Sequence, residues 1–247
     1  MEADGRTQKK PTSPWLYLGL GCGACVLLGL LGISAFTFFM YRKGKDIAEG
    51  FKNPQVREQR TREVLPYKEL PAGYYPAGAM SIPFLMDFAI LTDRPPAGTA
   101  GPDQQGFDQR SFIFMNMRHL RDNREKMERY LRGEAPAPDN SGWRQSNVHF
   151  QQKELIGRGV LKIGDLAVLY AANRGEVSHK DGSTKEGIVT MILPECPDDR
   201  LHFGTWIGPD PQSDKPLAQA NYAGTAADPA AMHDFLEKFQ LCGGVAK

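Results

Sequence analysis

One apolar run near the N-terminus constrains this chain more than any other feature. Residues 15–41 contain no charged side chain, and two basic residues follow directly. A helix rises about 1.5 Å per residue, so a hydrocarbon core of about 30 Å takes roughly 20 apolar residues to cross. The run exceeds that length. The sequence therefore predicts a transmembrane helix over 15–41, after a short polar tail over 1–14.

The run does not have the form of a cleaved signal peptide, whose apolar region is only about 7 to 15 residues long. Trp15 and Tyr17 at one end and Phe39 and Tyr41 at the other suit the headgroup level of a bilayer. We therefore expect a single-pass anchor in the cell membrane, with the lipid bilayer as a partner.

Flanking charges do not fix which way the anchor points. Arg6, Lys9 and Lys10 precede the run, and Arg42 and Lys43 begin a similar basic group after it. The positive-inside count is therefore nearly balanced. Because a first apolar segment often acts as an uncleaved signal anchor, we expect the C-terminal domain to be extracytoplasmic.

Small residues recur at four-residue spacing inside the run, at Gly21, Cys25 and Gly29. Small residues allow two helix backbones to approach closely in lipid. The spacing predicts a homodimer through this face. The alternative is that glycine is simply common in membrane helices.

Beyond the anchor, the sequence divides into two parts. Residues 42–73 are highly charged and form the predicted juxtamembrane spacer, with a short helix over Gln55–Val64 after Asn53 as N-cap. Residues 74–247 are long enough for one globular domain. A formal net charge of +1 gives no field to attract nucleic acid, which we exclude as a partner.

Most of the domain has the pattern of strands. Four stretches are apolar on both alternations, as in strands that are buried on both faces. They are Ser81–Thr92, Arg110–Met117, Asp165–Ala172 and Gly187–Leu193. Turn residues at Gly164–Asp165, Asn173–Gly175 and Asp181–Gly182 predict an antiparallel meander over Val148–Ile207.

Two amphipathic segments, Arg118–Arg132 and Pro229–Leu241, have the apolar spacing of helices. We therefore expect an α+β fold, a largely antiparallel sheet covered by helices on its faces. The order of elements resembles that of the PsbP and Mog1 sandwich group. The resemblance rests on element order alone, and it implies no function or residue for this chain.

Motifs of common enzymes are missing from the sequence. It has no G-x-S-x-G, no H-E-x-x-H and no G-x-x-x-x-G-K, and its five histidines stand singly. We expect no cofactor and no metal site. The sequence leaves open whether the chain is an enzyme, and it favours a domain that is not.

Three residues form the candidate pocket. Asp87 interrupts an apolar strand, where a buried carboxylate needs a partner. His202 and Trp206 lie on one face of a later strand, with Gly204 leaving a gap between them. The alternatives are a strand edge that lets Asp87 reach water and a strand face that is packed by a helix.

Cys196 and Cys242 are the only cysteines outside the apolar run. In an exported domain they could form a disulfide, whereas no spacing rule favours their meeting over two separate thiols.

Two functions follow from these features. The first is a non-enzymatic domain that binds a protein or envelope partner. The second is a membrane-tethered enzyme or small-molecule sensor that uses a pocket near Asp87 and His202.

Overall fold

The computed structural model describes residues 53–82, 84–95, 109–118, 121–136, 149–178 and 184–243. The predicted transmembrane helix, with its packing residues Gly21, Cys25 and Gly29, lies outside the described residues. None of the helices described is both long enough and apolar enough to span a membrane.

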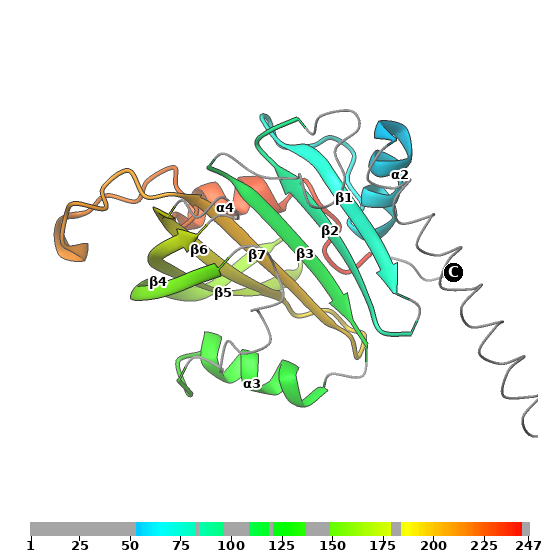
Figure 1. Cartoon of the computed structure of the whole chain (residues 1–247). Helices are drawn as coiled ribbons and strands as arrows, with labels where there is room; N and C mark the ends of the chain where they lie inside the picture. Colours follow the sequence, from blue (N-terminus) through cyan, green and yellow to red (C-terminus); the bar gives the residue numbers. More distant parts are fainter. Residues whose placement is uncertain are drawn as a thin grey trace, which may run out of the picture. The chain divides into compact units, whose positions relative to one another are not determined.

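The domain is built on one antiparallel sheet of seven strands, in the order β1-β2-β3-β7-β6-β5-β4 (Figure 1). The strands are β1 (Tyr75–Ile82), β2 (Met86–Thr92), β3 (Ser111–Met117), β4 (His149–Ile163), β5 (Leu166–Ser178), β6 (Thr184–Pro194) and β7 (Leu201–Pro209). Strands β4 to β7 pair with their neighbours in chain order, which confirms the predicted meander. The largely antiparallel sheet is confirmed as well, and the described helices are few and short.

The central strands are buried on both faces. In β6 the run from Gly187 to Pro194 is buried, and in β7 the run from Leu201 to Gly208 is buried. This burial explains why β6 is apolar on both alternations, since neither of its faces reaches water.

Helices α2 (Pro54–Val64) and α4 (Pro229–Leu236) contribute to the larger core cluster. Phe235 of α4 stacks on Trp206 with 4.4 Å between ring centroids and packs edge-on against Phe112. Val64 of α2 belongs to the same cluster, so α2 packs on the sheet although we expected it in the spacer.

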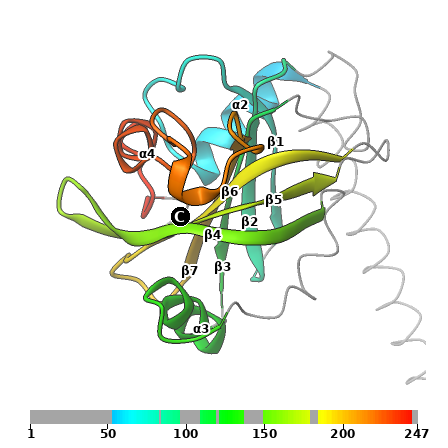
Figure 2. The same cartoon turned by 90° about the vertical axis from the view of Figure 1, so that its left-hand side faces the viewer.

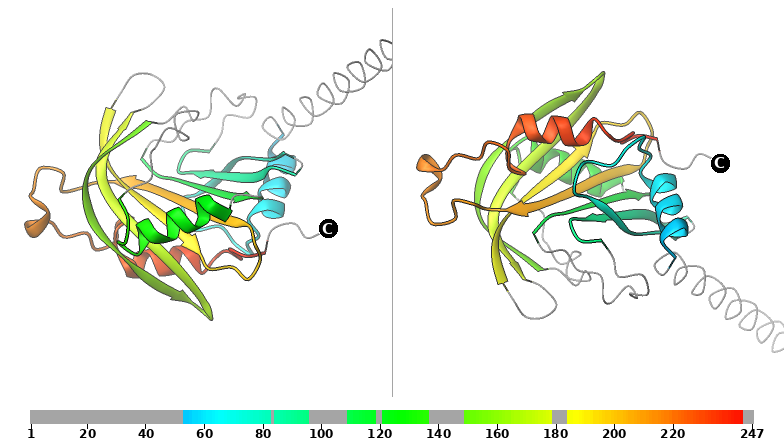
Figure 3. Two further views of the ribbon diagram at one scale, coloured as in Figure 1. Left: turned by 90° about the horizontal axis from the view of Figure 1, so that it is seen from below. Right: turned by 90° about the horizontal axis from the view of Figure 1, so that it is seen from above.

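Helix α3 (Arg121–Leu131) belongs to a second cluster. Its Met127, Tyr130 and Leu131 pack with Leu169 and Phe203. Figures 2 and 3 show α3 and α4 on opposite sides of the sheet.

Three sequence predictions differ from the structure. The stretch Ser81–Thr92 is not one strand but turns between β1 and β2, where Phe84 has a φ of 66°. The predicted turn Asn173–Gly175 lies inside β5; a Cβ at Gly175 would come 2.2 Å from the Gln151 oxygen, so this glycine permits a close strand approach instead.

The third difference concerns α4, which ends at Leu236 rather than Leu241. Beyond it the chain leaves the helix to pair with the segment after α2. Phe239 forms a bridge with Tyr67, and the Gln240 N–H donates to the Pro66 oxygen at 2.8 Å.

Strand β4 is at one edge of the sheet, and its pairing with β5 is irregular. The register shifts between Gln152 and Glu154 and again between Leu155 and Gly157. At the first shift, the Lys153 ammonium lies 2.7 Å from Glu176 and 2.6 Å from Glu186, on the next two strands.

Candidate functional site

Polar residues on four neighbouring strands stand in one register. Ser81 of β1 faces Asp87 of β2, Asp87 faces Asn116 of β3, and Asn116 faces His202 of β7. Directly opposite residues point to the same side of a sheet, with Cβ atoms about 4.5–5.5 Å apart. We call Ser81, Asp87, Asn116 and His202 the polar row.

The row lies on the side of the sheet that packs with α2 and α4. Phe114, two residues before Asn116, and Leu91, four residues after Asp87, both belong to that core cluster. Asp87, Asn116 and His202 are 2%, 0% and 1% exposed. Polar groups at such depth need partners, because burial removes their hydrogen bonds to water.

Asp87 has two partners among the described residues. The Ser81 hydroxyl donates to its Oδ1, and the Arg118 guanidinium lies 3.9 Å from its Oδ2. Oδ2 accepts no hydrogen bond within the described part of the chain. The carboxylate is therefore only partly satisfied, and a single loose ion pair balances its charge.

Asn116 and His202 are also satisfied on one side only. The Asn116 amide donates to the Val64 oxygen at 3.4 Å, and His202 Nε2 lies 2.7 Å from the Asp198 carboxylate. Because a carboxylate accepts, Nε2 is the nitrogen that carries the hydrogen. In the described structure, Asn116 Oδ1 and His202 Nδ1 have no hydrogen-bond partner.

The electrostatics of His202 follow from its depth. Burial lowers its pKa below the ordinary 6.5, and the nearby cations Arg200 and Arg124 act in the same direction. The Asp198 carboxylate opposes this shift by its hydrogen bond and its charge. The imidazole is consequently neutral at pH 7, with an unprotonated Nδ1 that faces the core.

The row does not bring Asp87 and His202 into contact. Neighbouring strands lie about 4.8 Å apart, so two strand spacings separate the backbones by about 10 Å. Asn116 stands between them, Asp87 binds Ser81, and His202 binds Asp198. Direct proton transfer between the two is excluded by this geometry, since it needs hydrogen-bond reach or one bridging water.

Trp206, the third predicted pocket residue, lies among aromatic side chains. Its ring stacks on Phe235 and its Nε1 donates to the Tyr74 hydroxyl at 2.7 Å. The space beside Gly204 is filled as well, because a Cβ there would come 3.0 Å from the Phe112 ring. Helix α4 thus packs the face that the sequence suggested as a pocket floor.

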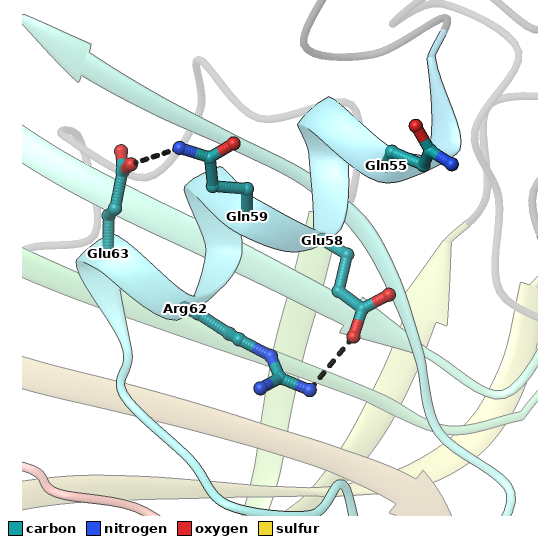
Figure 4. Close-up of a pocket in the computed structure, with 5 residues that line it drawn as sticks. All are labelled: Gln55, Glu58, Gln59, Arg62 and Glu63. Carbon is teal, nitrogen blue, oxygen red and sulfur yellow. Dashed lines mark hydrogen bonds and ion pairs between the residues drawn. The ribbon is translucent and has the colours of Figure 1, made fainter.

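One hollow among the described residues lies away from the predicted pocket. A shallow depression of about 420 Å³ follows the outward side of α2 and is lined by Gln55, Glu58, Gln59, Arg62 and Glu63 (Figure 4). Gln59 donates to Glu63, and Arg62 pairs with Glu58 at 2.9 Å. These side chains satisfy one another along the helix, as (i, i+4) pairs do.

Cys196 and Cys242 form a disulfide, which joins the loop after β6 to the segment after α4. Both ends lie near residues that bind the polar row. Asp198, which binds His202, lies two residues after Cys196. Gln240, two residues before Cys242, donates to the Pro66 oxygen, and Pro66 lies two residues after Val64, which binds Asn116. The disulfide therefore fixes the two segments that enclose this end of the sheet.

Sequence reasoning identified Asp87 and His202 and missed Ser81 and Asn116. Asn116 carries the same signal as Asp87, a lone polar residue in an apolar strand. A buried ion pair was missed too: Arg174 Nε lies 2.6 Å from the Asp210 carboxylate and holds the loop after β7.

Comparison with known proteins assigns no family. No family model matches the chain, and no curated protein matches it at a significant level. The likeness to the PsbP and Mog1 group therefore stays one of element order. Within the described residues, no group of three or more His, Cys, Asp or Glu side chains is placed to hold a metal ion.

Proposed function

We propose that this chain is a single-pass membrane-anchored protein whose globular domain binds a protein or envelope partner and catalyses no reaction. The architecture proposed for it is the α+β sandwich, with α2 and α4 covering one face of the sheet and α3 the other. The two core clusters, one with α4 residues and one with α3 residues, support this arrangement.

One observation carries the proposal: the candidate site residues Asp87 and His202 face inward, whereas a few large apolar side chains are exposed. Asp87 and His202 are buried and engaged with neighbours inside the domain. In contrast, Phe84 is 80% exposed and Leu85 is 53% exposed in the turn between β1 and β2. Two adjacent exposed apolar residues are typical of a contact surface.

The anchorage and its direction rest on sequence and on the disulfide. The apolar run over 15–41 is long enough to span a bilayer. The bond between Cys196 and Cys242 supports an extracytoplasmic domain, because disulfides persist in oxidising compartments. Pairing of two copies through Gly21, Cys25 and Gly29 is part of the same proposal.

A second candidate is a small-molecule sensor or enzyme at the polar row. It is favoured by three buried acceptors of the row that have no hydrogen bond in the described structure: Asp87 Oδ2, Asn116 Oδ1 and His202 Nδ1. A ligand that donates hydrogen bonds would satisfy them. The packed aromatic side chains beside the row argue for the binding function instead.

Photo-crosslinking of the full chain in its native membrane tests the proposal. A benzophenone amino acid replaces, one at a time, the exposed apolar residues Tyr75, Phe84, Leu85 and Val160. We expect at least one position to form an adduct with a protein or a lipid. The absence of adducts at all four would refute a binding function for these surfaces.

Two variants separate the candidate functions. Asp87→Asn and His202→Gln change the polar row and leave the surface as it is, so the adducts should persist in both. If either variant abolishes them, the sensor function is favoured. Alkaline carbonate extraction of the same membranes tests anchorage independently, since an integral chain stays in the pellet.

A further inference from the structure

The turn between β1 and β2 is an unusual place for a large apolar side chain. Phe84 adopts a φ of 66°, the left-handed region that glycine, asparagine and aspartate enter most easily. At 80% exposure it gains little packing within its own domain. Neither local conformation nor core packing accounts for phenylalanine here, so a contact outside the domain is the remaining physical reason.

The turn is apolar over several residues, and the backbone of a cationic residue, Arg118, is hydrogen-bonded to it. Leu85 is half-exposed, and Ile82 and Met86 on either side are partly buried. The Arg118 N–H donates to the Leu85 oxygen at 3.0 Å, and the Arg118 side chain is 31% exposed. Apolar side chains in front of a guanidinium match the order of acyl chains and phosphates at a bilayer surface.

The distance to the anchor is short enough for this contact. Residues 42–53 separate the apolar run from α2, and twelve residues extend at most about 40 Å. Figure 1 shows α2 and the turn between β1 and β2 at the same side of the domain, the right-hand side in that view. A tether of this length, joined to the domain at α2, permits the turn to reach the bilayer.

We propose that Phe84 and Leu85 insert into the interfacial layer of the membrane that holds the chain, with Arg118 at the level of the phosphates. The inference rests on the proposed anchorage and names the envelope partner as phospholipid. Two side chains give only a weak attachment by themselves. The anchor makes it effective, since it turns the contact into an intramolecular event at high local concentration.

The crosslinking experiment tests this inference at matched positions. Tyr75 is the control, because it is an exposed aromatic residue at the opposite end of β1. In the full chain in native membranes, benzophenone at position 84 should give a phospholipid adduct, identified by its mass. At position 75 the lipid adduct should be several-fold weaker.

Three results would overturn the inference: a protein adduct in place of lipid at position 84, equal lipid adducts at both positions, or none at 84. A protein adduct would still support the proposed binding function. Loss of the chain on carbonate extraction would instead refute the anchorage itself. If the position 84 variant fails to fold, the same probe at Leu85 repeats the test.

Discussion

The polar row and the β1–β2 turn lie within a few residues of each other and reverse the usual distribution of side chains. Asp87 is 2% exposed, while Phe84, three residues earlier, is 80% exposed. The carboxylate has partners inside the domain, Ser81 and Arg118. The Phe84 ring, in contrast, packs little against the described residues of the domain. The contrast teaches that two adjoining segments divide their side chains: the row binds partners inside the domain, and the exposed turn is the segment for which we propose a contact beyond it.

The largest change in stability is expected from the disulfide, which joins two segments near the polar row. Replacing Cys196 and Cys242 by alanine frees a loop with a sequence separation of 46. The chain-entropy model then predicts a loss of up to about 4 kcal/mol in the free energy of unfolding. Chemical denaturation of the full chain in detergent measures it. Reductant should destabilise the wild type and leave the double variant unchanged.

The next effect compares the two regions directly. Asp87→Ala removes the acceptor of the Ser81 hydroxyl and should lower the free energy of unfolding by about 1–3 kcal/mol. Phe84→Ser, at an exposed position, should change it by less than about 0.5 kcal/mol. Asp87→Asn is the matched control, because it keeps an acceptor for Ser81. Equal losses in the alanine and serine variants would break the comparison.

His202 of the polar row should contribute a pH dependence to stability that the turn does not. Burial places the pKa of His202 below 6.5, its value in the unfolded chain. Below pH 6.5 the unfolded chain binds a proton that the folded chain does not, so stability falls as the pH decreases toward the folded pKa. The slope from this residue is at most about 1.4 kcal/mol per pH unit.

Denaturation of the wild type and of His202→Gln at pH 7.5 and pH 5.5 measures this slope. The glutamine variant should lose less stability over the interval. An identical loss in both proteins would show that His202 does not titrate differently on folding.

The smallest effect concerns the turn. A left-handed backbone conformation costs an L-residue about 1–2 kcal/mol, and glycine avoids this cost. Part of the gain is lost, because glycine also increases the conformational entropy of the unfolded chain. Phe84→Gly should therefore raise the free energy of unfolding by about 0.5–1 kcal/mol relative to Phe84→Ala. The alanine variant is the control, since it removes the ring and keeps the strained φ of 66°. No difference between the two would contradict that strain.

Much of the fold could be predicted from the sequence. Buried strands leave long apolar runs, so β3 and β6 are visible in the sequence. The start of α2 is visible too, because Asn53 caps it by accepting from two backbone N–H groups. These signals are local, and each depends on a few neighbouring residues.

The site was less predictable because it depends on register. Asp87 and Asn116 are each visible as a lone polar residue in an apolar strand, but only the pairing of β2 with β3 brings them together. The pairing of Ser81 with Asp87 depends in turn on the β1–β2 turn at Phe84, for which Pro83 is the one usual turn residue in an otherwise apolar stretch. The exposure of Phe84 could not be foreseen either, since the sequence places it in an apolar stretch typical of the core.

The irregular edge strand would have a consequence for the membrane-anchored protein that we propose. Molecules tethered to one membrane diffuse in its plane, so their domains meet more often than free domains would. An open sheet edge can then pair with the edge of a neighbouring copy. On β4, two register shifts interrupt the regular ladder, and Lys153 joins Glu176 and Glu186 across three strands. Crowding in the plane of the proposed membrane would then bring neighbouring copies together without joining their sheets into one.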